Sequence, residues 1–550
     1  MFLYPNRIYI VQPNDTLYET AKRFNTSVKN IMAANYLSSP LLMIGQRLII
    51  PTSNIYIVKP GDTLYKIAEK FGTSIKKIMS LNKLKSPILT IGQQLQIPFQ
   101  DIYIVKPGDT LYLIAKKFNT TIENIVKLNE LSSPQLMVGQ KLKIPRYSEV
   151  VVDVDISNIR QGRGLNYKII DTMTKGAKLP SLAYSNKWYK VRLYNGKEGW
   201  ISENNVKSNV YGGDKPLTYN LGFYTLEEGP KLPSSYNSFV ENTDSISETG
   251  LFMFRLDEDN PTEIEKFGEF TKEYVEDVIN KGHQNNVRVL AVVHNLLYDG
   301  GTKVAKDLVS EMLSTNVNRQ RFIQNIIELI EGYGFDGVNI DIEDVYQKDS
   351  EKLSSFYKEL GEELEKRGYY FSASIPSRVS DKPFNPFSDP FNYSAIGDAV
   401  EEFVVMLYNE HGWPGSGPGP VVSIGWMERV LNYTITKMPK EKIVAAVSVF
   451  GFDFNLTTGK NTYVTYEMAM DLAKKYNKEV IFDEETKTPM FSYVDEKGDK
   501  HEVWFENKYS ILAKIELAHN MGIKGVALWR LGMEDQSLWK MLQEDVVVVR

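Results

Sequence analysis

Hydrophobic and polar positions recur at a fixed interval through the first part of the chain. The phrase Ile-Tyr-Ile-Val begins at Ile8, Ile55 and Ile102, and the residues that follow keep the same 47-residue period to residue 145. In each copy a β-branched and aromatic stretch precedes apolar residues at helical spacing, a second short helical stretch and a closing Ile-Pro strand. The pattern predicts three strand–helix–helix–strand modules, which are too small to hold a catalytic centre beside their cores.

The pattern changes to short strands separated by turns over residues 148–208. Aromatic and β-branched stretches such as Trp188–Val191 and Gly196–Ile201 have the spacing of strands and turns in a small barrel. We therefore expect a small all-β domain at 148–208. A linker is expected at 209–217, because the sequence Gly-Gly-Asp-Lys-Pro within it interrupts strand and helix patterns alike.

Beyond residue 218, short apolar strands alternate with helical stretches. Eight such units predict a (β/α)8 TIM barrel over 218–550, whose active site would lie at the carboxyl ends of the strands. The expected strands are 221–224, 251–254, 287–293, 337–343, 370–375, 403–408, 443–450 and 525–529. The interval 451–524 exceeds one helix and contains a hairpin pattern, so we expect a small α+β insertion there that walls the cleft.

Composition excludes several classes of protein. The 550 residues are 42% hydrophobic and 24% charged, the balance of a soluble protein with several globular domains. There is no cysteine, which removes disulfides, thiolate metal sites and cysteine nucleophiles together. No apolar stretch approaches the ~20 residues of a membrane-spanning helix. The amino terminus lacks the pattern of a secretory signal, so we expect cytoplasmic synthesis without a signal peptide and no membrane insertion.

The net charge of −5 is divided unevenly along the chain. Residues 1–146 carry 19 Lys and Arg against 8 Asp and Glu, a charge of +11, which leaves 45 against 61, or −16, for residues 147–550. The lysines are spread over the three repeats instead of alternating with aromatic residues or following one helix. This distribution argues against nucleic acid and favours contact with an anionic polymer or surface.

The stretch Gly334–Glu343 carries the strongest chemical signal. Because side chains alternate across a strand, Asn339, Asp341 and Glu343 share one face, while the apolar residues between them pack against helices. Two carboxylates thus point into the predicted barrel, where burial and mutual repulsion raise the pKa of one towards the value that a general acid needs. An acidic patch that holds a metal or a salt bridge is the structural alternative. No metal-ligand spacing, phosphate loop or nucleotide motif is present, so we expect no cofactor and no metal.

The three repeats resemble the LysM domain over their whole length, with expected boundaries at 7–51, 54–98 and 101–145. In that family, the loop after the first strand and the loop before the last strand form a shallow groove for glycans that contain N-acetylglucosamine. The resemblance implies glycan-binding positions in each repeat: Asp15, Thr16 and Ile44; Asp62, Thr63 and Ile91; Asp109, Thr110 and Val138. Helix capping by these Asp and Thr side chains is the alternative interpretation.

Residues 148–208 resemble the bacterial Src-homology-3-like domain. The usual Asn-Val-Arg-Ser-Gly-Pro sequence of that family appears here as Asn-Ile-Arg-Gln-Gly-Arg, at Asn158–Arg163. The resemblance leaves two roles open for this domain, either peptide binding or the spacing of its neighbours.

The stretch 336–343 resembles the Asp-x-x-Asp-x-Asp-x-Glu motif of family 18 glycoside hydrolases, with Asn339 in place of the second Asp. The likeness extends over 218–545 in strand order. It implies that Glu343 protonates the leaving glycosidic oxygen and then activates water. It also implies that Asp341 orients the N-acetyl group of the substrate and stabilises the charge developing on it, because the acetamido oxygen is the nucleophile in that family.

A second motif, Met406–Asn409, resembles the Met-x-Tyr-Asp of the same family, with Asn in place of Asp. Tyr408 would then hydrogen-bond the acetamido group, and Trp529 would stack on the sugar before the scissile bond, the −1 sugar. The resemblance implies catalytic roles for Glu343, Asp341, Tyr408 and Asn339. It implies substrate contacts at Trp529, Asn409, Met406, Asn295 and Asp336.

The Ser-x-Gly-Gly of that family is replaced by Val293-His294-Asn295 after the third strand. This change and Asn339 resemble the branch that contains spore cortex-lytic N-acetylglucosaminidases of germination, which also carry LysM repeats and lack a signal peptide. His294 either contacts sugar or is hydrogen-bonded within the fold, and both interpretations stay open.

Together these features predict an endo-acting peptidoglycan hydrolase that cleaves after N-acetylglucosamine with retention. We expect it at the interface of spore coat and cortex, with peptidoglycan or another N-acetylglucosamine polymer as its partner and spore-coat proteins as further partners. A chitinase is one alternative, because both polymers place N-acetylglucosamine before the scissile bond. A glycan-binding protein of the spore envelope without catalytic activity is another, although such proteins usually lack the acid at Glu343.

Overall fold

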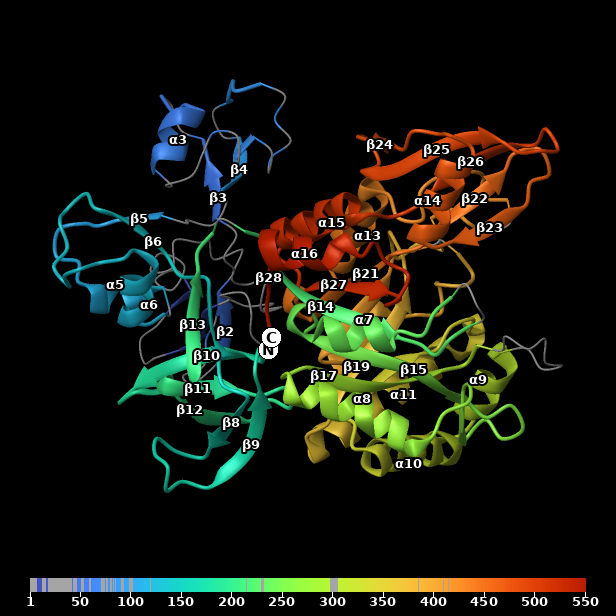
Figure 1. Ribbon diagram of the computed structural model, residues 1–550, viewed down its shortest axis with the longest axis horizontal. Coiled ribbons are helices and arrows are strands. Elements are labelled where there is room, and N and C mark those ends of the chain that lie inside the picture. Colours follow the sequence, from blue (N-terminus) through green and yellow to red (C-terminus); the bar gives the residue numbers. More distant parts are fainter. Residues whose placement is uncertain are drawn as a thin grey trace.

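The computed structural model describes nearly all of the chain from residue 102 onward and parts of the first two repeats. The described residues are 7–11, 16, 17, 42, 47–50, 54–58, 61–70, 75, 78, 79, 82, 84, 86–90, 93–97, 102–118, 120–213, 215–228, 232–296, 305–383, 385–408, 410–413 and 415–550. Figure 1 shows the repeats and a small β-rich domain beside the larger carboxyl-terminal domain.

Each repeat contains one antiparallel strand pair. The pairs are β1 (Arg7–Ile10) with β2 (Arg47–Ile50), β3 (Asn54–Ile57) with β4 (Gln94–Ile97), and β5 (Ile102–Ile104) with β6 (Lys141–Lys143). The second repeat contains helix α3 (Leu64–Lys70), and the third contains α5 (Leu111–Lys117) and α6 (Ile122–Leu128) between its strands. The predicted strand–helix–helix–strand order is therefore confirmed in the third repeat.

Residues 147–211, here named the β domain, form a small barrel-like sheet. Its strands are β7 (Tyr147–Val152), β8 (Ile156–Arg160), β9 (Ile169–Thr174), β10 (Lys178–Ser185), β11 (Trp188–Arg192), β12 (Glu198–Ser202) and β13 (Val206–Tyr211). Strand β13 pairs with β7 along its whole length. The linker expected at 209–217 is therefore shorter than predicted, because residues 209–211 belong to the sheet.

Eight parallel strands close into a barrel because β27 pairs with β14 as well as with β21, and β14 pairs with β15. The strands are β14 (Leu217–Tyr224), β15 (Glu248–Leu256), β17 (Arg288–His294), β18 (Gly337–Asp341), β19 (Tyr370–Pro376), β20 (Glu402–Met406), β21 (Ile443–Ser448) and β27 (Gly525–Trp529). Each overlaps one of the eight strands expected from the sequence, so the TIM barrel is confirmed.

Helices surround the barrel and bury its outer face. They are α7 (Tyr236–Glu241), α8 (Lys272–Gln284), α9 (Ala305–Leu313), α10 (Asn316–Tyr333), α11 (Ser350–Arg367), α12 (Tyr393–Ala399), α13 (Ile424–Thr434), α15 (Lys508–Met521) and α16 (Ser537–Asp545). The short strands β16 (Ile264–Lys266) and β28 (Val547–Val548) pair with β15 and β14. Apolar side chains between the helices and strands form the main core.

The expected insertion contains a five-stranded antiparallel sheet and one helix. Its elements are β22 (Gly451–Asn455), β23 (Asn461–Val464), α14 (Tyr466–Lys475), β24 (Ile481–Asp483), β25 (Thr488–Val494) and β26 (Lys500–Trp504). Strands β25 and β26 are the hairpin that the sequence predicts. The insertion follows β21 directly, so it stands at the carboxyl end of the barrel.

Buried ion pairs occupy the amino end of the barrel. Arg288 Nη1 lies 3.1 Å from Glu248 Oε2, and Lys524 pairs with Glu402. All four groups come from the first residues of their strands or from just before them. Because these side chains fill the amino end, a reaction site in this fold lies at the carboxyl end.

The β domain docks on the amino end of the barrel. Tyr194 stacks on His283 of α8 with ring centroids 3.9 Å apart, and Arg288 Nε donates to the Tyr194 carbonyl at 3.2 Å. The third repeat in turn contacts the β domain, where Asn124 Nδ2 donates to Ser148 Oγ at 3.1 Å. Figure 1 shows these modules on the side of the barrel away from the loops that follow its strands.

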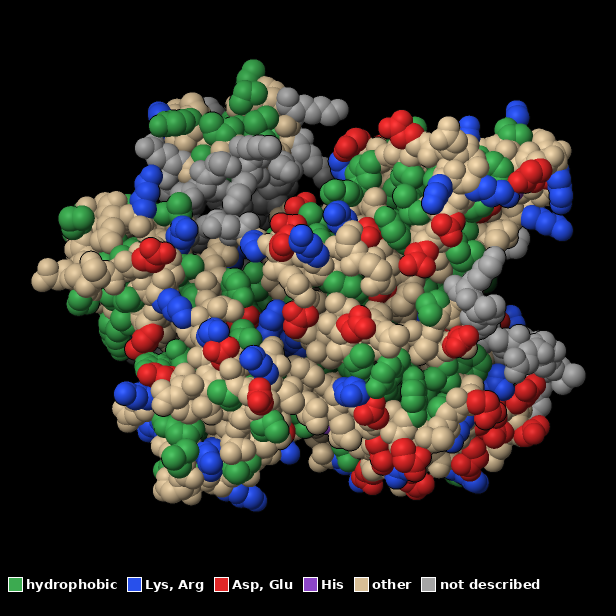
Figure 2. Space-filling view, viewed as in Figure 1, with side chains coloured by type: hydrophobic (Ala, Val, Ile, Leu, Met, Phe, Trp, Pro, Cys, Tyr) green, Lys and Arg blue, Asp and Glu red, His purple; other side chains and the backbone are tan. Residues whose placement is uncertain are grey.

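Charged side chains are distributed unevenly over the surface. Figure 2 shows Lys and Arg side chains scattered over the β domain, whereas Asp and Glu side chains gather around α10 of the barrel. Among helices within the described ranges, none combines the length and apolar character needed to cross a membrane.

Candidate active site

Two glycines direct the carboxylates into the barrel mouth. Helix α10 ends at Gly334, whose φ of +83° few other residues adopt without strain. Strand β18 then starts at Gly337, where a Cβ would lie only 1.9 Å from the Tyr370 carbonyl oxygen. From this start Asn339 and Asp341 face the barrel interior by alternation, and residue 343 follows just beyond the end of the strand.

Asp341 and Glu343 form a carboxylate pair at the carboxyl end of β18. Asp341 is buried, and burial followed by the nearby Glu343 raises its pKa well above the usual range. Burial and then the charge of Asp344 raise the pKa of Glu343 to about 7. The pair thus retains a proton near neutral pH, which is the condition for one of its members to act as a general acid.

Asn339 is held deeper in the barrel by two serines of β19. Its Nδ2 donates to Ser372 Oγ at 2.8 Å, and Ser374 Oγ donates to its Oδ1 at 2.9 Å. Ser372 Oγ donates onward to Glu402 Oε1 at 3.0 Å. The Asn339 amide therefore belongs to a chain of buried hydrogen bonds below Asp341 in the barrel.

Asn295 grips the main chain of the expected catalytic acid. Its Nδ2 donates to the Glu343 carbonyl at 2.6 Å, and the Glu343 amide donates to its Oδ1 at 2.8 Å. The Asn295 side chain is buried, so both polar ends of the amide are used within the protein. Asn295 therefore fixes the backbone that carries Glu343, and its expected contact with substrate stays a prediction.

Aromatic rings gather at the same end of the barrel. The indole of Trp529 lies 6.2 Å from Tyr408, 5.0 Å from Phe252 and 5.3 Å from Phe223, as measured between ring centroids. Trp529 and Tyr408 are both partly exposed, and they come from the carboxyl ends of β27 and β20. A half-open aromatic wall of this kind suits the apolar face of a sugar ring.

Three buried polar atoms at the mouth have no hydrogen-bond partner within the described part of the chain. They are Asp341 Oδ1, His294 Nε2 and Ser448 Oγ. They come from the carboxyl ends of three barrel strands, β18, β17 and β21. Because buried polar groups are almost always satisfied, unpaired groups gathered at one mouth indicate a place for a polar ligand.

Asp336 is not brought to this mouth. It precedes β18 and lies at the amino end of the strand, where its Oδ2 is 2.9 Å from His283 Nε2 and accepts from the Val289 amide at 2.8 Å. The expected substrate contact of Asp336 is therefore corrected to a structural role.

Met406 ends β20 and is buried, in register with β19 and β21, while Asn409 lies outside the described residues.

In the third repeat the two expected groove loops adjoin, since the Gly139 amide donates to the Val105 carbonyl at 2.8 Å. Asp109 accepts from Tyr103 OH and from the Lys106 amide, both at 2.7 Å. Thr110 caps α5 by accepting from the Leu113 amide at 3.2 Å. Capping thus occupies Thr110 and bonds within the preceding turn occupy Asp109, whereas Val138 is 67% exposed.

The equivalent residues of the other repeats are only partly described. Thr16 and Thr63 are exposed, and Thr63 accepts from the Lys66 amide at 3.2 Å as a helix cap. Asp62 is partly buried. The other expected positions, Asp15, Ile44 and Ile91, lie outside the described residues.

Sequence reasoning did not single out Phe252 and Ser448 as part of the mouth. Phe252 stacks on the His294 ring with centroids 3.9 Å apart, and Ser448 is the register partner of Trp529. The alternation of side chains along β15 and β21 was the available signal, because it places both residues on the interior face near the carboxyl ends of their strands.

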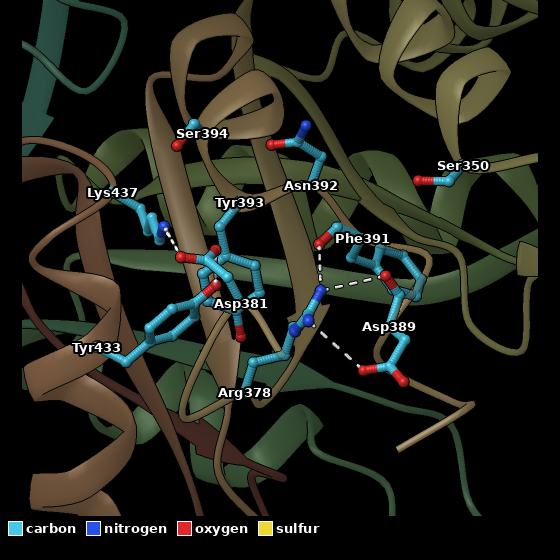
Figure 3. Close-up of a pocket in the computed structure, with 10 residues that line it drawn as sticks. All are labelled: Ser350, Arg378, Asp381, Asp389, Phe391, Asn392, Tyr393, Ser394, Tyr433 and Lys437. Carbon is cyan, nitrogen blue, oxygen red and sulfur yellow. Dashed lines mark hydrogen bonds and ion pairs between the residues drawn. The ribbon is translucent and has the colours of Figure 1, made fainter. Parts of the chain in front are cut away.

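A separate hollow lies between α12 and α13, with a volume of about 210 Å³. Figure 3 shows that its charged groups pair with one another. Arg378 donates to the carbonyls of Asp389 and Phe391 at 3.1 and 3.4 Å, and Lys437 lies 2.6 Å from Asp381. These contacts fasten the loop after β19, and the carboxylate pair of β18 lies elsewhere.

Known families account for most of the chain. The model for glycosyl hydrolases family 18 matches residues 257–534, the LysM domain matches 9–51, 56–98 and 103–145, and the bacterial SH3 domain matches 154–207. The cortical fragment-lytic enzyme of Bacillus anthracis is 30% identical over 277 residues, which cover 50% of this chain and 63% of that protein. The uncharacterized glycosylase YvbX of Bacillus subtilis is 28% identical, over 51% of this chain and 81% of that protein.

A solved structure extends the likeness beyond the barrel. The spore cortex-lytic enzyme SleL of Bacillus cereus is 25% identical, with a TM-score of 0.54, over 90% of this chain and 98% of that structure. The alignment with the B. anthracis enzyme spans less than two thirds of that protein. Because the family match covers half of the chain and includes the barrel strand that carries Asp341 and the loop residue Glu343, the chain belongs to glycosyl hydrolases family 18.

Proposed function

We propose that this protein hydrolyses the glycan strands of spore cortex peptidoglycan, cutting after N-acetylglucosamine with retention of configuration. The observation that carries the proposal is the proton-retaining pair Asp341 and Glu343 beside Trp529, in a chain whose relatives include cortex-lytic enzymes. The family match makes the protein a glycoside hydrolase. The choice of polymer is the proposed part.

Glu343 is the proposed general acid and then the general base. A carboxyl with a pKa of about 7 is substantially protonated at neutral pH, so it donates a proton to the leaving glycosidic oxygen. The carboxylate that remains then accepts a proton from the incoming water. Asn295 keeps its backbone in place through both steps.

Asp341 and Tyr408 are the proposed partners of the acetamido group. Asp341 Oδ1, which has no hydrogen-bond partner among the described residues, can accept from the acetamido N–H. Its ionised form would stabilise the positive charge that develops as the acetamido oxygen attacks the anomeric carbon. Tyr408 stands on the neighbouring wall beside Trp529. Trp529 would stack on the sugar that carries the group.

The LysM repeats are the proposed anchor. Exposed apolar residues such as Met137 and Val138 in the third repeat offer contact area for sugar rings, and the repeats carry the positive end of the chain. Three weak sites on one chain raise avidity for an insoluble polymer without any one of them binding tightly.

Changing Asn295 to Leu should lower kcat about 10- to 100-fold while KM changes little, because losing both main-chain bonds displaces Glu343. Asn295→Asp keeps the acceptor and loses the donor, so its kcat should lie between that of Asn295→Leu and that of the unaltered chain. Steady-state kinetics on soluble glycan, with melting temperatures as the control for folding, measure the effect. An increased KM at unchanged kcat would mean that Asn295 binds substrate after all.

Activity should fall as the pH rises through about 7, because Glu343 must be protonated to act as the acid and its pKa is raised to that value. Asp344→Asn removes a charge that helps to raise this pKa, so the alkaline limb of kcat/KM should move to lower pH by less than about one unit, since burial is the larger cause. Asn tolerates the φ of +50° at this position. A limb that moved to higher pH would contradict the assignment of Glu343.

The polymer is tested by digesting purified cortex, vegetative wall and chitin with the full chain and analysing the products by mass spectrometry. N-acetylglucosamine at the new reducing ends of cortex fragments is the expected result. Reducing-end muramic acid would contradict the proposed bond, and release from chitin alone would make the protein a chitinase. Glu343→Gln is the matched control, and binding to wall without products from any polymer would favour a glycan-binding protein without catalytic activity.

A further inference from the structure

His294 is held rigidly at the barrel mouth beside Asp341. It is the last residue of β17, and its register partner on β18 is Asp341. Its ring centroid lies 3.9 Å from that of Phe252, with an interplanar angle of 3°, and 4.8 Å from that of Phe267, which is nearly perpendicular to it. Two aromatic neighbours and complete burial therefore leave this imidazole one orientation.

The hydrogen bonds of the ring determine which nitrogen carries the proton. The Leu296 amide donates to His294 Nδ1 at 3.2 Å, so Nδ1 is the acceptor and the proton of the neutral ring sits on Nε2. Nε2 is buried and has no hydrogen-bond partner among the described residues. A buried N–H left unsatisfied is destabilising, and a ligand that accepts from it would remove that cost.

The surroundings of the ring favour its neutral form. Burial, followed by the positive charge of Arg255 on β15, lowers the pKa of His294 well below its usual value. Arg255 is itself paired with Glu265 at 2.7 Å. In this neutral form, His294 is a hydrogen-bond donor through Nε2.

The free donor and a free acceptor stand on neighbouring strands. Asp341 Oδ1, also unpaired, accepts where His294 Nε2 donates, and the two side chains point to the same side of the sheet. Phe252 joins the imidazole to the stacking wall, since its edge lies 5.0 Å from Trp529. A sugar that stacks on Trp529 and donates its acetamido N–H to Asp341 would have its ring hydroxyls near His294.

We propose that His294 is a substrate-binding residue, donating its Nε2–H to a hydroxyl oxygen of the −1 sugar that stacks on Trp529. The proposal rests on the proposed function, because it takes that sugar to be N-acetylglucosamine held through its acetamido group. The acceptor is a hydroxyl because the acetamido oxygen must stay free to attack the anomeric carbon. His294 thereby makes the subsite selective for a sugar that is unsubstituted at that hydroxyl.

The test uses a thiazoline derived from chitobiose, a compound that resembles the cyclised −1 sugar, together with its 3-deoxy and 6-deoxy forms. His294→Phe keeps a ring against Phe252 and removes the donor, so it should bind the parent compound about 10-fold more weakly. One deoxy compound should bind the unaltered chain and His294→Phe equally well, and that compound identifies the hydroxyl. His294→Gln keeps an N–H and should recover part of the loss.

Controls separate binding from folding and from catalysis. His283→Phe changes the histidine that stacks on Tyr194 at the opposite end of the barrel and should leave inhibitor affinity unaltered. The pH profile of His294→Phe should keep both limbs in place, because the proposed role of the ring is binding and not proton transfer. If both deoxy compounds show the same loss in His294→Phe as the parent, or if a limb moves, the proposal is wrong.

Inhibitor binding does not require turnover, so the two hypotheses can fail separately. Absence of cleavage on every glycan would contradict the proposed function while the binding comparison still tested His294. Normal cleavage with no coupling between His294 and any hydroxyl would contradict this inference alone.

Discussion

Changing Glu343 to Gln should lower kcat at least ~100-fold, because the amide cannot protonate the leaving oxygen. The fold should survive, since Asn295 holds the main chain of residue 343 and not its carboxyl. Glycan binding through the repeats should also persist. Turnover on soluble muropeptide chains, with pull-down on purified wall, measures both parts of the expectation.

Asp344→Asn is the matched control for this variant. It changes the next carboxylate along the chain, which is partly exposed and pairs with Lys306 at 3.4 Å, and it should retain activity below neutral pH. Near-normal turnover by Glu343→Gln would remove Glu343 from the role of acid. Equal losses in both variants would indicate a general disturbance of the loop.

Asp341→Asn should be as severe, with a loss of ~100-fold or more, because the developing acetamido cation would lose its carboxylate partner. De-N-acetylated glycan should not be cleaved by the unaltered chain, since the nucleophile is then missing. Kinetics on acetylated and deacetylated chains of equal length provide the measurement. Comparable rates on both would point to a carboxylate nucleophile, for which Asp341 is the candidate.

Asn339→Asp is the control for position 341 and should remain active. A protonated Asp at 339 can still donate to Ser372 and accept from Ser374, as the amide does. Loss of activity in this variant would mean that Asp341 needs an uncharged neighbour below it.

Local sequence patterns were sufficient to predict each domain and the carboxylate pair. The repeats share a 47-residue period, and the eight strands are short apolar runs with few competing interpretations. Asp341 and Glu343 follow from alternation along one strand. These features depend on residues close together in the chain, where periodicity carries the information.

Contacts between distant segments were not predictable in the same way. Asp336 looked like a member of the motif, yet five residues along a strand separate it from Asp341 by nearly the whole depth of the sheet. Asn295 could be matched to a motif position, but its hold on Glu343 depends on two strands meeting. The β domain docks on the barrel through the contact of Tyr194 with His283. This contact could not be predicted, because no periodic pattern in either segment indicates it.

With the proposed anchoring role of the third repeat, this docking would limit how far from the bound glycan the cleft can act. Tyr194 stacks on His283, and Asn124 of the third repeat bonds to Ser148, so these contacts link the third repeat, the β domain and the barrel. A flexible linker would let the cleft reach any bond within the length of the linker. A stiff frame would instead fix one distance between the bound glycan and the bond that is cleaved. On immobilised wall, fragments released by an anchored molecule would then have a narrow size distribution, and the strand it cuts would be a neighbour of the strand it grips.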